Sequence, residues 1–319
     1  MEKFLVLYNP LAGNGSGYRM AMSLKKLLRE DELEFQDFTR ILDYPGFFAE
    51  LDPERKIIVC GGDGTLNRFV NYSDGVKMPN DVYYCAGGSG NDFFSDLSRP
   101  KGGCGNAPVN INRYVRDLPY ALIKGRKYYF LNGVGVGLDG YCCEVGEKTR
   151  GTSPRPINYT KIAITGVLHY YQPKSAVVTV DGKSHFYDKV WLCPVMNGRY
   201  FGGGMMPTPN QDRLNPEHTV SVMVIHDVGR LQLSALLPQI FFGKHTIHEK
   251  NVDILQGREV HIRLSEPAPV QIDGEVIPGV SEFTVVTAKA EAAAQAAEAM
   301  KAQEAAKQAG SGSTETEKN

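Results

Sequence analysis

The sequence has no run of about 18 apolar residues, the length at which a helix spans a membrane. Its apolar start is also too short for a secretory signal peptide. The six cysteines include no CxxC pair of the kind that binds zinc, and several lie inside apolar runs, which predicts buried free thiols in a reducing compartment. We therefore expect a cytoplasmic protein without a transmembrane segment.

An excess of one charge is also missing. The 319 residues include 35 basic and 36 acidic ones, so the formal net charge is −1. This balance creates no overall field that would attract nucleic acid. The two commonest nucleotide-binding signatures are absent too, because no GxxxxGK precedes a Ser or Thr and no GxGxxG follows the first apolar run. These absences exclude a nucleic-acid-binding protein and the standard P-loop and dinucleotide sites.

The first hundred residues alternate short apolar runs with amphipathic segments, separated by clusters of Gly, Pro, Asn and Asp. This alternation predicts βαβ units and a Rossmann-like parallel sheet. The predicted strands are 4–8, 34–39, 56–60 and 82–85, and the predicted helices are 18–29, 45–51 and 66–71. From about residue 105 the character of the sequence changes.

Strand-like runs follow one another in the second half, and several precede turn signals such as Asp181-Gly182 and Asp273-Gly274. The predicted strands are 128–136, 176–180, 190–195, 219–225, 259–264, 270–272 and 282–286, with helices at 159–171 and 231–242. This pattern predicts a mostly antiparallel β domain. The Ala-, Glu- and Lys-rich end predicts a solvated helix and then disorder.

The stretch at 57–71 runs from an apolar strand into Gly61, Gly62, Asp63, Gly64 and Thr65. Glycines let the backbone N–H groups approach a phosphate, and a following helix start favours an anion. A carboxylate fits there if Mg²⁺ lies between it and the phosphates. The alternative is a simple turn in which the aspartate caps a helix. Similar loops at 9–17 and 86–94 favour a ligand site, because loops after parallel strands gather at one sheet edge.

Several motifs together resemble one known family. NPxAG at Asn9–Gly13, GGDGTLN at Gly61–Asn67 and GSGND at Gly88–Asp92 are followed by NGVGVGLDG at Asn132–Gly140, NGRYFGGGM at Asn197–Met205 and QIDGE at Gln271–Glu275. Their order and spacing resemble the diacylglycerol kinase catalytic domain of bacterial lipid kinases and of sphingosine and ceramide kinases. The resemblance covers residues 3 to about 287. It implies an ATP-binding α/β domain at 1–115, a β-sandwich lipid-substrate domain at 116–287 and a tail at 288–319.

The resemblance also implies site residues. It assigns ATP contacts to Asn9, Pro10, Gly13, Thr39, Gly61, Gly62, Asp63, Gly64, Thr65, Asn67, Ser89 and Glu275. Asp63 and Asp92 would organise Mg²⁺, and Asp273 would be the catalytic base, with Asp63 as its competitor. The alternative for Asp273 is a purely structural type I′ hairpin turn, since Asp-Gly between apolar strands is a strong turn signal.

The activity implied is ATP-dependent phosphorylation of a lipid alcohol, with diacylglycerol to phosphatidate as the first choice. An NAD kinase-like enzyme with a soluble acceptor and a non-catalytic nucleotide-binding regulator are the alternatives. A structural Mg²⁺ found in part of the family is doubtful, because Asn215-Pro216 stands where Asp-Gly would be. The oligomeric state stays open, a homodimer included.

A lipid substrate would require contact with the inner face of a membrane. The segment 231–250 combines Leu236, Leu237, Ile240, Phe241 and Phe242 with two nearby lysines, as interfacial segments do. The alternative is that these side chains pack on the β domain. Two further patterns favour plain structural explanations. His245 and His248 predict a helix end rather than a metal site, and the alternating glycines at 133–137 predict close backbone packing.

Overall fold

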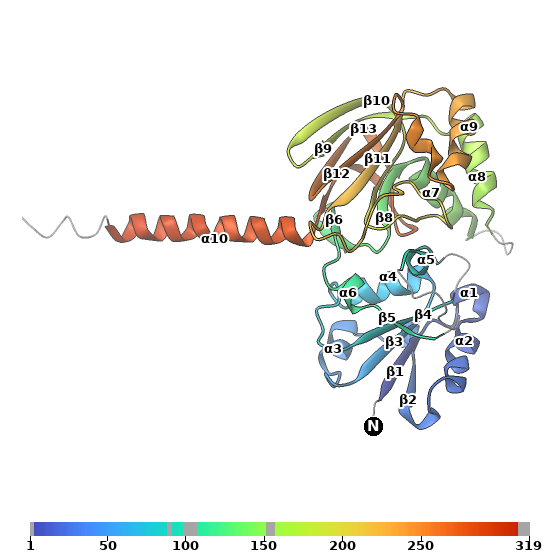
Figure 1. The fold of residues 1–319 in the computed structure, drawn as a ribbon, viewed down its shortest axis with the longest axis vertical. Coiled ribbons are helices and arrows are strands. Elements are labelled where there is room, and N and C mark those ends of the chain that lie inside the picture. The colour runs from blue at the N-terminus through green and yellow to red at the C-terminus, as the bar shows by residue number, and fades with distance from the viewer. Residues whose placement is uncertain (1–2, 88–90, 98–106, 151–156, 312–319) are drawn as a thin grey trace, which may run out of the picture.

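The computed structural model describes residues 3–87, 91–97, 107–150 and 157–311 (Figure 1). Its first sheet has the strand order β2-β1-β3-β4-β5. The strands are β1 (Phe4–Tyr8), β2 (Leu33–Asp37), β3 (Lys56–Gly61), β4 (Val82–Ala86) and β5 (Val109–Asn110). The first four are parallel and β5 is antiparallel to β4. The predicted parallel α/β domain is therefore confirmed, with the predicted strands 4–8, 34–39, 56–60 and 82–85 each within two residues.

Helices cover both faces of this sheet, because its central strands are apolar on both sides. The helices are α1 (Ala12–Gly15), α2 (Gly17–Ser23), α3 (Tyr44–Ala49), α4 (Asp63–Tyr72), α5 (Asp92–Asp96) and α6 (Asn112–Val115). Short 3-10 turns lie at Leu24–Lys26, Glu30–Glu32 and Phe38–Arg40. Leu66, Phe69 and Val70 of α4 pack on one face, and Ala21 of α2 packs on the other.

The second sheet is antiparallel throughout and has the order β12-β11-β10-β8-β13-β14-β6-β7, with β9 pairing both β10 and β13. Its strands are β6 (Tyr120–Ile123), β7 (Arg126–Tyr129), β8 (Gly133–Gly137), β9 (Lys174–Val180), β10 (Lys183–Met196), β11 (Val220–His226), β12 (Val252–Gly257), β13 (Glu259–Ile272) and β14 (Glu275–Val286). This arrangement encloses an apolar core rich in valine. The predicted antiparallel β domain is confirmed.

The helices of the second half lie on one side of this sheet (Figure 1). They are α7 (Leu138–Arg150), α8 (Tyr159–Thr165) with a π turn at Gly166–Tyr170, and α9 (Arg230–Ile240) with a 3-10 turn at Lys244–Ile247. After the last strand, α10 (Ala288–Ser311) extends away from the rest of the molecule. Among the described residues, each helix is too short or too polar to cross a bilayer.

Some sequence predictions are wrong in detail. The single strand predicted at 128–136 is divided between β7 and β8, with a turn between them. The strands predicted at 259–264 and 270–272 form one bulged strand, β13. Thr39 lies in a 3-10 turn rather than in a strand. The helix α7 and the short strands β6 and β12 were not predicted, because α7 begins within a glycine-rich run and β6 has only four residues.

The glycines of β8 are confirmed as packing residues. A Cβ at Gly135 would lie 2.0 Å from Asp139 Oδ2. Gly137 has a φ of +120°, and a Cβ there would lie 2.6 Å from the carbonyl oxygen of Trp191. Both positions therefore exclude a larger side chain, the second also through its backbone conformation.

Candidate active site

The strand ends that lead into two of the predicted phosphate loops lie side by side at the carboxyl edge of the first sheet. β3 ends at Gly61 and α4 starts at Asp63, while β4 ends at Ala86 and α5 starts at Asp92. Gly61 pairs with Ala86, so the two loops leave the sheet together. Glycine is required at 61, because a Cβ there would lie 2.4 Å from Thr65 Oγ1.

Asp63 stands at the first turn of α4 and faces three other carboxyl or amide groups. Its Oδ2 accepts a hydrogen bond from the backbone N–H of Asp92 at 2.8 Å, and Asn132 Nδ2 lies 3.5 Å from the same oxygen. Its Oδ1 is buried and has no hydrogen-bond partner among the residues that the structure describes. Burial, together with the neighbouring charges of Asp92 and Asp273, raises the pKa of Asp63 to about 7. The group can therefore take up or release a proton near neutral pH.

Asp273 lies across the domain junction in the turn between β13 and β14, where φ is positive at both Asp273 and Gly274. This is the two-residue hairpin turn that the Asp-Gly signal predicts. Its side chain accepts four hydrogen bonds, from the backbone N–H groups of Leu131, Asn132 and Gly133 and from Asn67 Nδ2, at 2.6 to 3.0 Å. Burial raises the pKa of Asp273, while these donors oppose the shift. The carboxylate joins the second sheet to α4.

Asp92 makes a second junction between the two halves of the chain. Its two carboxylate oxygens accept the backbone N–H groups of Gly203 and Gly204, each at 2.8 Å. Both glycines have positive φ, in a loop closed by the pairing of Phe201 with Met205. Burial raises the pKa of Asp92. The loop Phe201–Met205, which follows β10, therefore binds the start of α5 through two backbone N–H groups.

A third junction is an ion pair that the sequence did not suggest. Asp96 of α5 binds Arg199 Nε at 2.6 Å and Arg213 Nε at 2.8 Å. The side chains of Asp96 and Arg213 are each only 3% exposed. Arg213 also donates to the carbonyl of Leu131 and to Asn132 Oδ1. A cavity of about 220 Å³ opens beside these arginines.

The remaining predicted nucleotide contacts divide into three groups. Gly64 is exposed with open space around it, and Asn9, Pro10, Gly13 and Gly62 lie half-buried in the loops. Thr65 and Asn67 are buried, and Asn67 binds Asp273 and the carbonyl of Tyr129 across the junction. Thr39 is exposed and bonded to Asp37, and Glu275 is exposed at the start of β14. Ser89 lies outside the described residues.

The described residues contain no group of three or more His, Cys, Asp or Glu side chains that could hold a metal ion by themselves. A Mg²⁺ ion in this site would therefore take phosphate oxygens and water among its ligands, as Mg²⁺ commonly does. The unpartnered Oδ1 of Asp63 fits such an ion, as it fits a proton. Asp92 retains lone pairs beyond those used by the two glycines.

Two further metal candidates have structural explanations. His245 is fully buried, and its Nε2 lies 2.8 Å from the carbonyl oxygen of Pro207. The histidine therefore holds the chain at Pro207 in place. In the loop at 209–218, Asn215 Nδ2 donates to the carbonyls of Asp212 and Thr219. Its Oδ1 accepts the N–H of Thr219. The carboxamide therefore fills this turn with protein hydrogen bonds.

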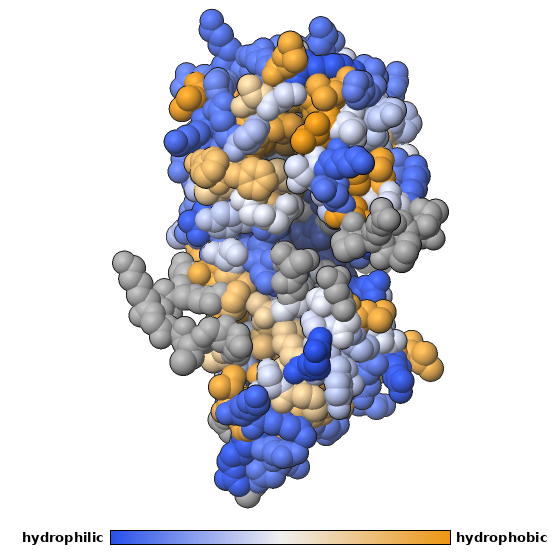
Figure 2. All heavy atoms as spheres, turned by 90° about the vertical axis from the view of Figure 1, so that its right-hand side faces the viewer, coloured by the Kyte–Doolittle hydropathy of each residue, from blue (hydrophilic) through white to orange (hydrophobic). Residues whose placement is uncertain are grey.

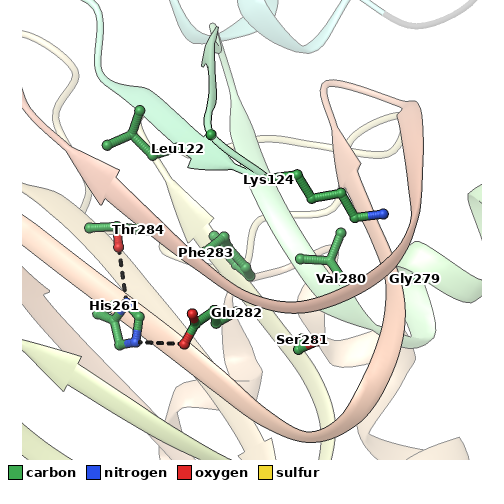
Figure 3. A pocket seen from close by; sticks show the side chains of 10 residues that line it. Leu122, Lys124, His261, Gly279, Val280, Ser281, Glu282, Phe283 and Thr284 are labelled. Carbon is green, nitrogen blue, oxygen red and sulfur yellow. Dashed lines mark hydrogen bonds and ion pairs between the residues drawn. The ribbon is translucent and has the colours of Figure 1, made fainter.

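Figure 3 shows a separate cavity of about 340 Å³ on the second sheet. It is lined by Lys124, His261 and Glu282 among others, and His261 is bonded to Thr284. None of the predicted site residues that the structure describes lines this cavity. We therefore place the candidate active site at the domain junction, where Figure 2 shows a hydrophilic recess between the two halves of the molecule.

Sequence reasoning missed the residues that complete the junction: Asp96, Asn132, Gly203, Gly204 and Arg213. Asn132 and the two glycines lay within recognised motifs, but the motifs did not predict their hydrogen bonds across the junction. Nothing in the spacing of Asp96 and Arg213 indicated a pair, since they are 117 residues apart. Only the folded chain brings them together.

Comparisons with known proteins agree with this two-domain fold. Residues 3–119 match the diacylglycerol kinase catalytic domain, and residues 132–293 match the YegS C-terminal NAD kinase beta sandwich-like domain. "Putative lipid kinase YtlR" of Bacillus subtilis is 24% identical over 90% of this chain and 97% of its own length. A diacylglycerol kinase of Mycobacterium tuberculosis is 23% identical over 82% of this chain and 84% of its own.

A solved diacylglycerol kinase structure from Bacillus anthracis str. Sterne has the same fold. It superposes with a TM-score of 0.56 at 20% identity, covering 90% of this chain and 93% of that one. At this identity the likeness speaks for the fold alone. The match to the YegS C-terminal NAD kinase beta sandwich-like domain spans half of the chain, and the match to the diacylglycerol kinase catalytic domain precedes it, in the order that the sequence motifs predicted. The chain therefore belongs to the family that this pair of domains defines, a diacylglycerol kinase catalytic domain followed by the YegS C-terminal domain.

Proposed function

We propose that this kinase-family protein transfers the γ-phosphate of ATP to the hydroxyl of a lipid alcohol, with diacylglycerol as the first acceptor and phosphatidate as the product. The observation that carries the proposal is Asp63. Its carboxylate lies at the carboxyl edge of the parallel sheet, at the start of α4, and one of its oxygens is buried and has no hydrogen-bond partner in the described part of the chain. A proton acceptor in this position suits an attacking alcohol.

In the proposed reaction the alcohol oxygen attacks the γ-phosphorus. The bond between that phosphorus and the oxygen bridging to the β-phosphate breaks, and ADP leaves with that electron pair. The proton of the alcohol passes to Asp63 Oδ1. Because the pKa of Asp63 is raised to about 7, the carboxylate is a stronger base than an ordinary aspartate and is still substantially ionised at neutral pH.

The glycine loops would hold the nucleotide. Gly61, Gly62 and Gly64 allow close approach of the backbone, and the N-terminal end of the ten-residue helix α4 favours the negative phosphates. Asp63 and Asp92 would hold Mg²⁺ through its water ligands. When bound, this ion would neutralise phosphate charge. Asn9, Pro10 and Gly13 of the first loop would contact the nucleotide from the neighbouring strand.

Asp273 is less suited to be the base than the resemblance implies. Four N–H donors already bind its two oxygens, and the side chain is buried at the junction. A substrate hydroxyl would have to displace one of these donors. We therefore propose that Asp273 anchors the turn at 131–133 and Asn67, while Asp63 accepts the proton.

A lipid acceptor is supported by an exposed apolar surface on the second half of the chain, which we name the α8–α9 surface. It comprises Ile164, Leu168, Tyr170, Leu231, Phe241, Phe242 and Ile247. Arg230 Nη2 donates to the carbonyl of Tyr171 at 3.1 Å, which joins the two segments. Figure 1 places α8 and α9 together, and Figure 2 shows apolar groups on this face of the upper domain.

The charge of the α8–α9 surface suits an anionic bilayer. Residues 157–171 and 229–250 carry three exposed lysines, Lys161, Lys244 and Lys250, against one acidic residue, Glu249. Leu236 and Ile240 of the predicted interfacial segment are buried in the core instead, so the packing alternative holds for them. Phe241 and Phe242 remain exposed. We propose that they meet the inner face of the membrane peripherally.

The test is phosphorylation of a panel of acceptors with radiolabelled ATP, read by the mass of the product. The panel contains micellar diacylglycerol, monoacylglycerol, phosphatidylglycerol, undecaprenol and a sphingoid base, with NAD as the soluble acceptor. Label in a lipid that requires Asp63 supports the proposal. Label in NAD alone would replace it with an NAD kinase-like function, and ATP binding without turnover would favour a regulator.

A further inference from the structure

Arg213 lies buried in the loop before β11 and contacts three separate partners. Its guanidinium pairs with Asp96 at 2.8 Å, donates to the carbonyl of Leu131 at 3.0 Å and donates to Asn132 Oδ1 at 3.3 Å. It also lies over the ring of Phe93, 4.7 Å from the centroid. A planar guanidinium with five N–H groups can satisfy these acceptors together, whereas a lysine ammonium cannot match the same fork.

Arg213 binds the turn at residues 131–133, and this turn also contacts the aspartates of the junction. The N–H groups of Leu131 and Asn132 bind Asp273. The side chain of Asn132 lies between Arg213 on one side and Asp63 on the other. Both ends of this one amide are therefore used, its oxygen toward the arginine and its nitrogen toward the aspartate.

The orientation of that amide follows from the charges around it. A guanidinium has donors only, so it selects the oxygen end of Asn132. The NH₂ end must then point to Asp63, where it faces Oδ2 at 3.5 Å. The reversed amide would place its oxygen against the carboxylate and its NH₂ against the guanidinium, and both contacts would be repulsive. Arg213 thus determines that the NH₂ end of the Asn132 amide, rather than its oxygen, faces Asp63.

We propose that Arg213 is a positioning residue, which orients the Asn132 amide and thereby holds the Asp63 carboxylate with Oδ1 directed to the reacting groups. The inference rests on the proposed role of Asp63. Arg213 does not touch Asp63 itself, so it acts only through Asn132. Asp96 neutralises the buried guanidinium and keeps it in place.

A purely structural ion pair is the competing explanation, and the chain offers a matched control. Arg199 binds the same Asp96 but makes no contact with residues 131 or 132 in the described structure. Arg199→Gln therefore removes one partner of Asp96 and leaves the amide orientation intact. Arg213→Lys keeps a positive charge for Asp96 and loses the fork that reaches Asn132.

The experiment compares kcat and KM for wild type, Arg213→Lys, Asn132→Ala, the double variant and Arg199→Gln. We expect Arg213→Lys to lower kcat by roughly ten- to a hundredfold with KM for ATP within about threefold of wild type, because it disturbs the reacting geometry rather than binding. The kcat of the double variant should be no lower than that of Asn132→Ala, since Arg213 acts on Asp63 only through the Asn132 amide. Arg199→Gln should keep the wild-type kcat within about twofold.

A second measurement does not depend on turnover. The side-chain amide of Asn132 in the resting ¹⁵N-labelled protein, assigned by its loss in Asn132→Ala, should give one sharp NH₂ pair that shifts or broadens in Arg213→Lys and not in Arg199→Gln. An unchanged NH₂ pair, or multiplicative losses of kcat in the double variant, would overturn the inference. If wild type phosphorylates no acceptor, the proposed function fails, and the amide signal still decides whether Arg213 orients Asn132. Should Arg213→Lys not fold, Arg213→Gln is measured in the same way.

Discussion

Asp63 and Asp273 face the same domain junction from opposite sheets, yet their surroundings differ. Asp273 comes from an antiparallel hairpin and has four N–H donors on its two oxygens. Asp63 comes from the start of a helix after a parallel strand, and its Oδ1 has no partner among the described residues. Both carboxylates are largely buried. The difference teaches that the supply of donors, rather than burial, separates a carboxylate that holds the structure together from one that is available for chemistry.

The largest expected effect is on catalysis at Asp63. Asp63→Asn should lower phosphotransfer by about a hundredfold or more, because an amide cannot accept the proton. The fold should persist, since the N–H of Asp92 can still bind the amide oxygen. Turnover with saturating acceptor and the melting curve measure the two properties. Wild-type turnover in a folded Asp63→Asn variant would remove the distinction between the two aspartates.

The next effect is on stability at Asp273. Asp273→Asn should lower the free energy of unfolding by about 2 to 4 kcal/mol, because an NH₂ group would replace an acceptor facing two buried N–H donors. Denaturant unfolding measures the loss. Asp181→Asn is the matched control, since Asp181 also precedes a glycine in a hairpin turn with positive φ, but it is exposed and its two N–H donors bind the same oxygen, which asparagine retains. We expect it to change stability by less than about 0.5 kcal/mol.

The contrary result at Asp273 is equally clear. If Asp273 were the base, Asp273→Asn would abolish transfer while the unfolding free energy and ATP binding stayed at their wild-type values. Asparagine also tolerates positive φ, so the turn itself gives no reason for a loss of stability. An inactive variant with normal stability would therefore exchange the roles that we propose for the two aspartates.

Asp139 is a third buried aspartate and can be compared with Asp63 and Asp273. It is buried at the start of α7, accepts Gln271 Nε2 at 3.3 Å and has no partner at Oδ1. Burial raises the pKa of Asp139 to about 6. Because the unfolded chain releases this proton near its ordinary pKa of about 4, the folded state binds more protons between these values, and stability falls as pH rises.

Asp139→Asn removes this pH dependence. Relative to wild type, the variant should gain about 2 kcal/mol of unfolding free energy between pH 4 and pH 7. Measuring the difference at several pH values cancels any constant effect of the new amide. A difference that stays constant over this range would mean that burial does not raise the pKa of this carboxyl.

The smallest expected effect concerns the α8–α9 surface, which lies away from both aspartates. Phe242→Ser with Lys244→Glu should weaken binding to anionic vesicles by about three- to tenfold, because it removes one exposed aromatic group and reverses one charge. Affinity for ATP should not change. Phe186→Ser with Lys183→Glu is the control, since Phe186 is 70% exposed, close to the 71% of Phe242. Equal losses in both double variants would place the membrane contact elsewhere.

The sequence by itself determined the two kinds of sheet and the position of the glycine-rich loop that carries Asp63. Alternating apolar runs and helical segments indicated the parallel sheet, because local periodicity reflects burial on both faces. The glycines around Asp63 indicated a loop with exposed N–H groups, and Asp273-Gly274 indicated a hairpin turn, because both depend on backbone conformations that few residues adopt. These are local properties, and a few adjacent residues carry them.

Only the tertiary structure decided what each aspartate meets. The donors of Asp273 come from Asn67 and from residues 131–133, and the partners of Asp92 lie 111 and 112 residues away. Arg213 contacts Asp96 and Asn132, which lie 117 and 81 residues away in the sequence, because the fold brings these segments together. Hydrogen bonds and ion pairs of this kind depend on distance and angle between segments that are remote in the chain, and no local pattern specifies either quantity.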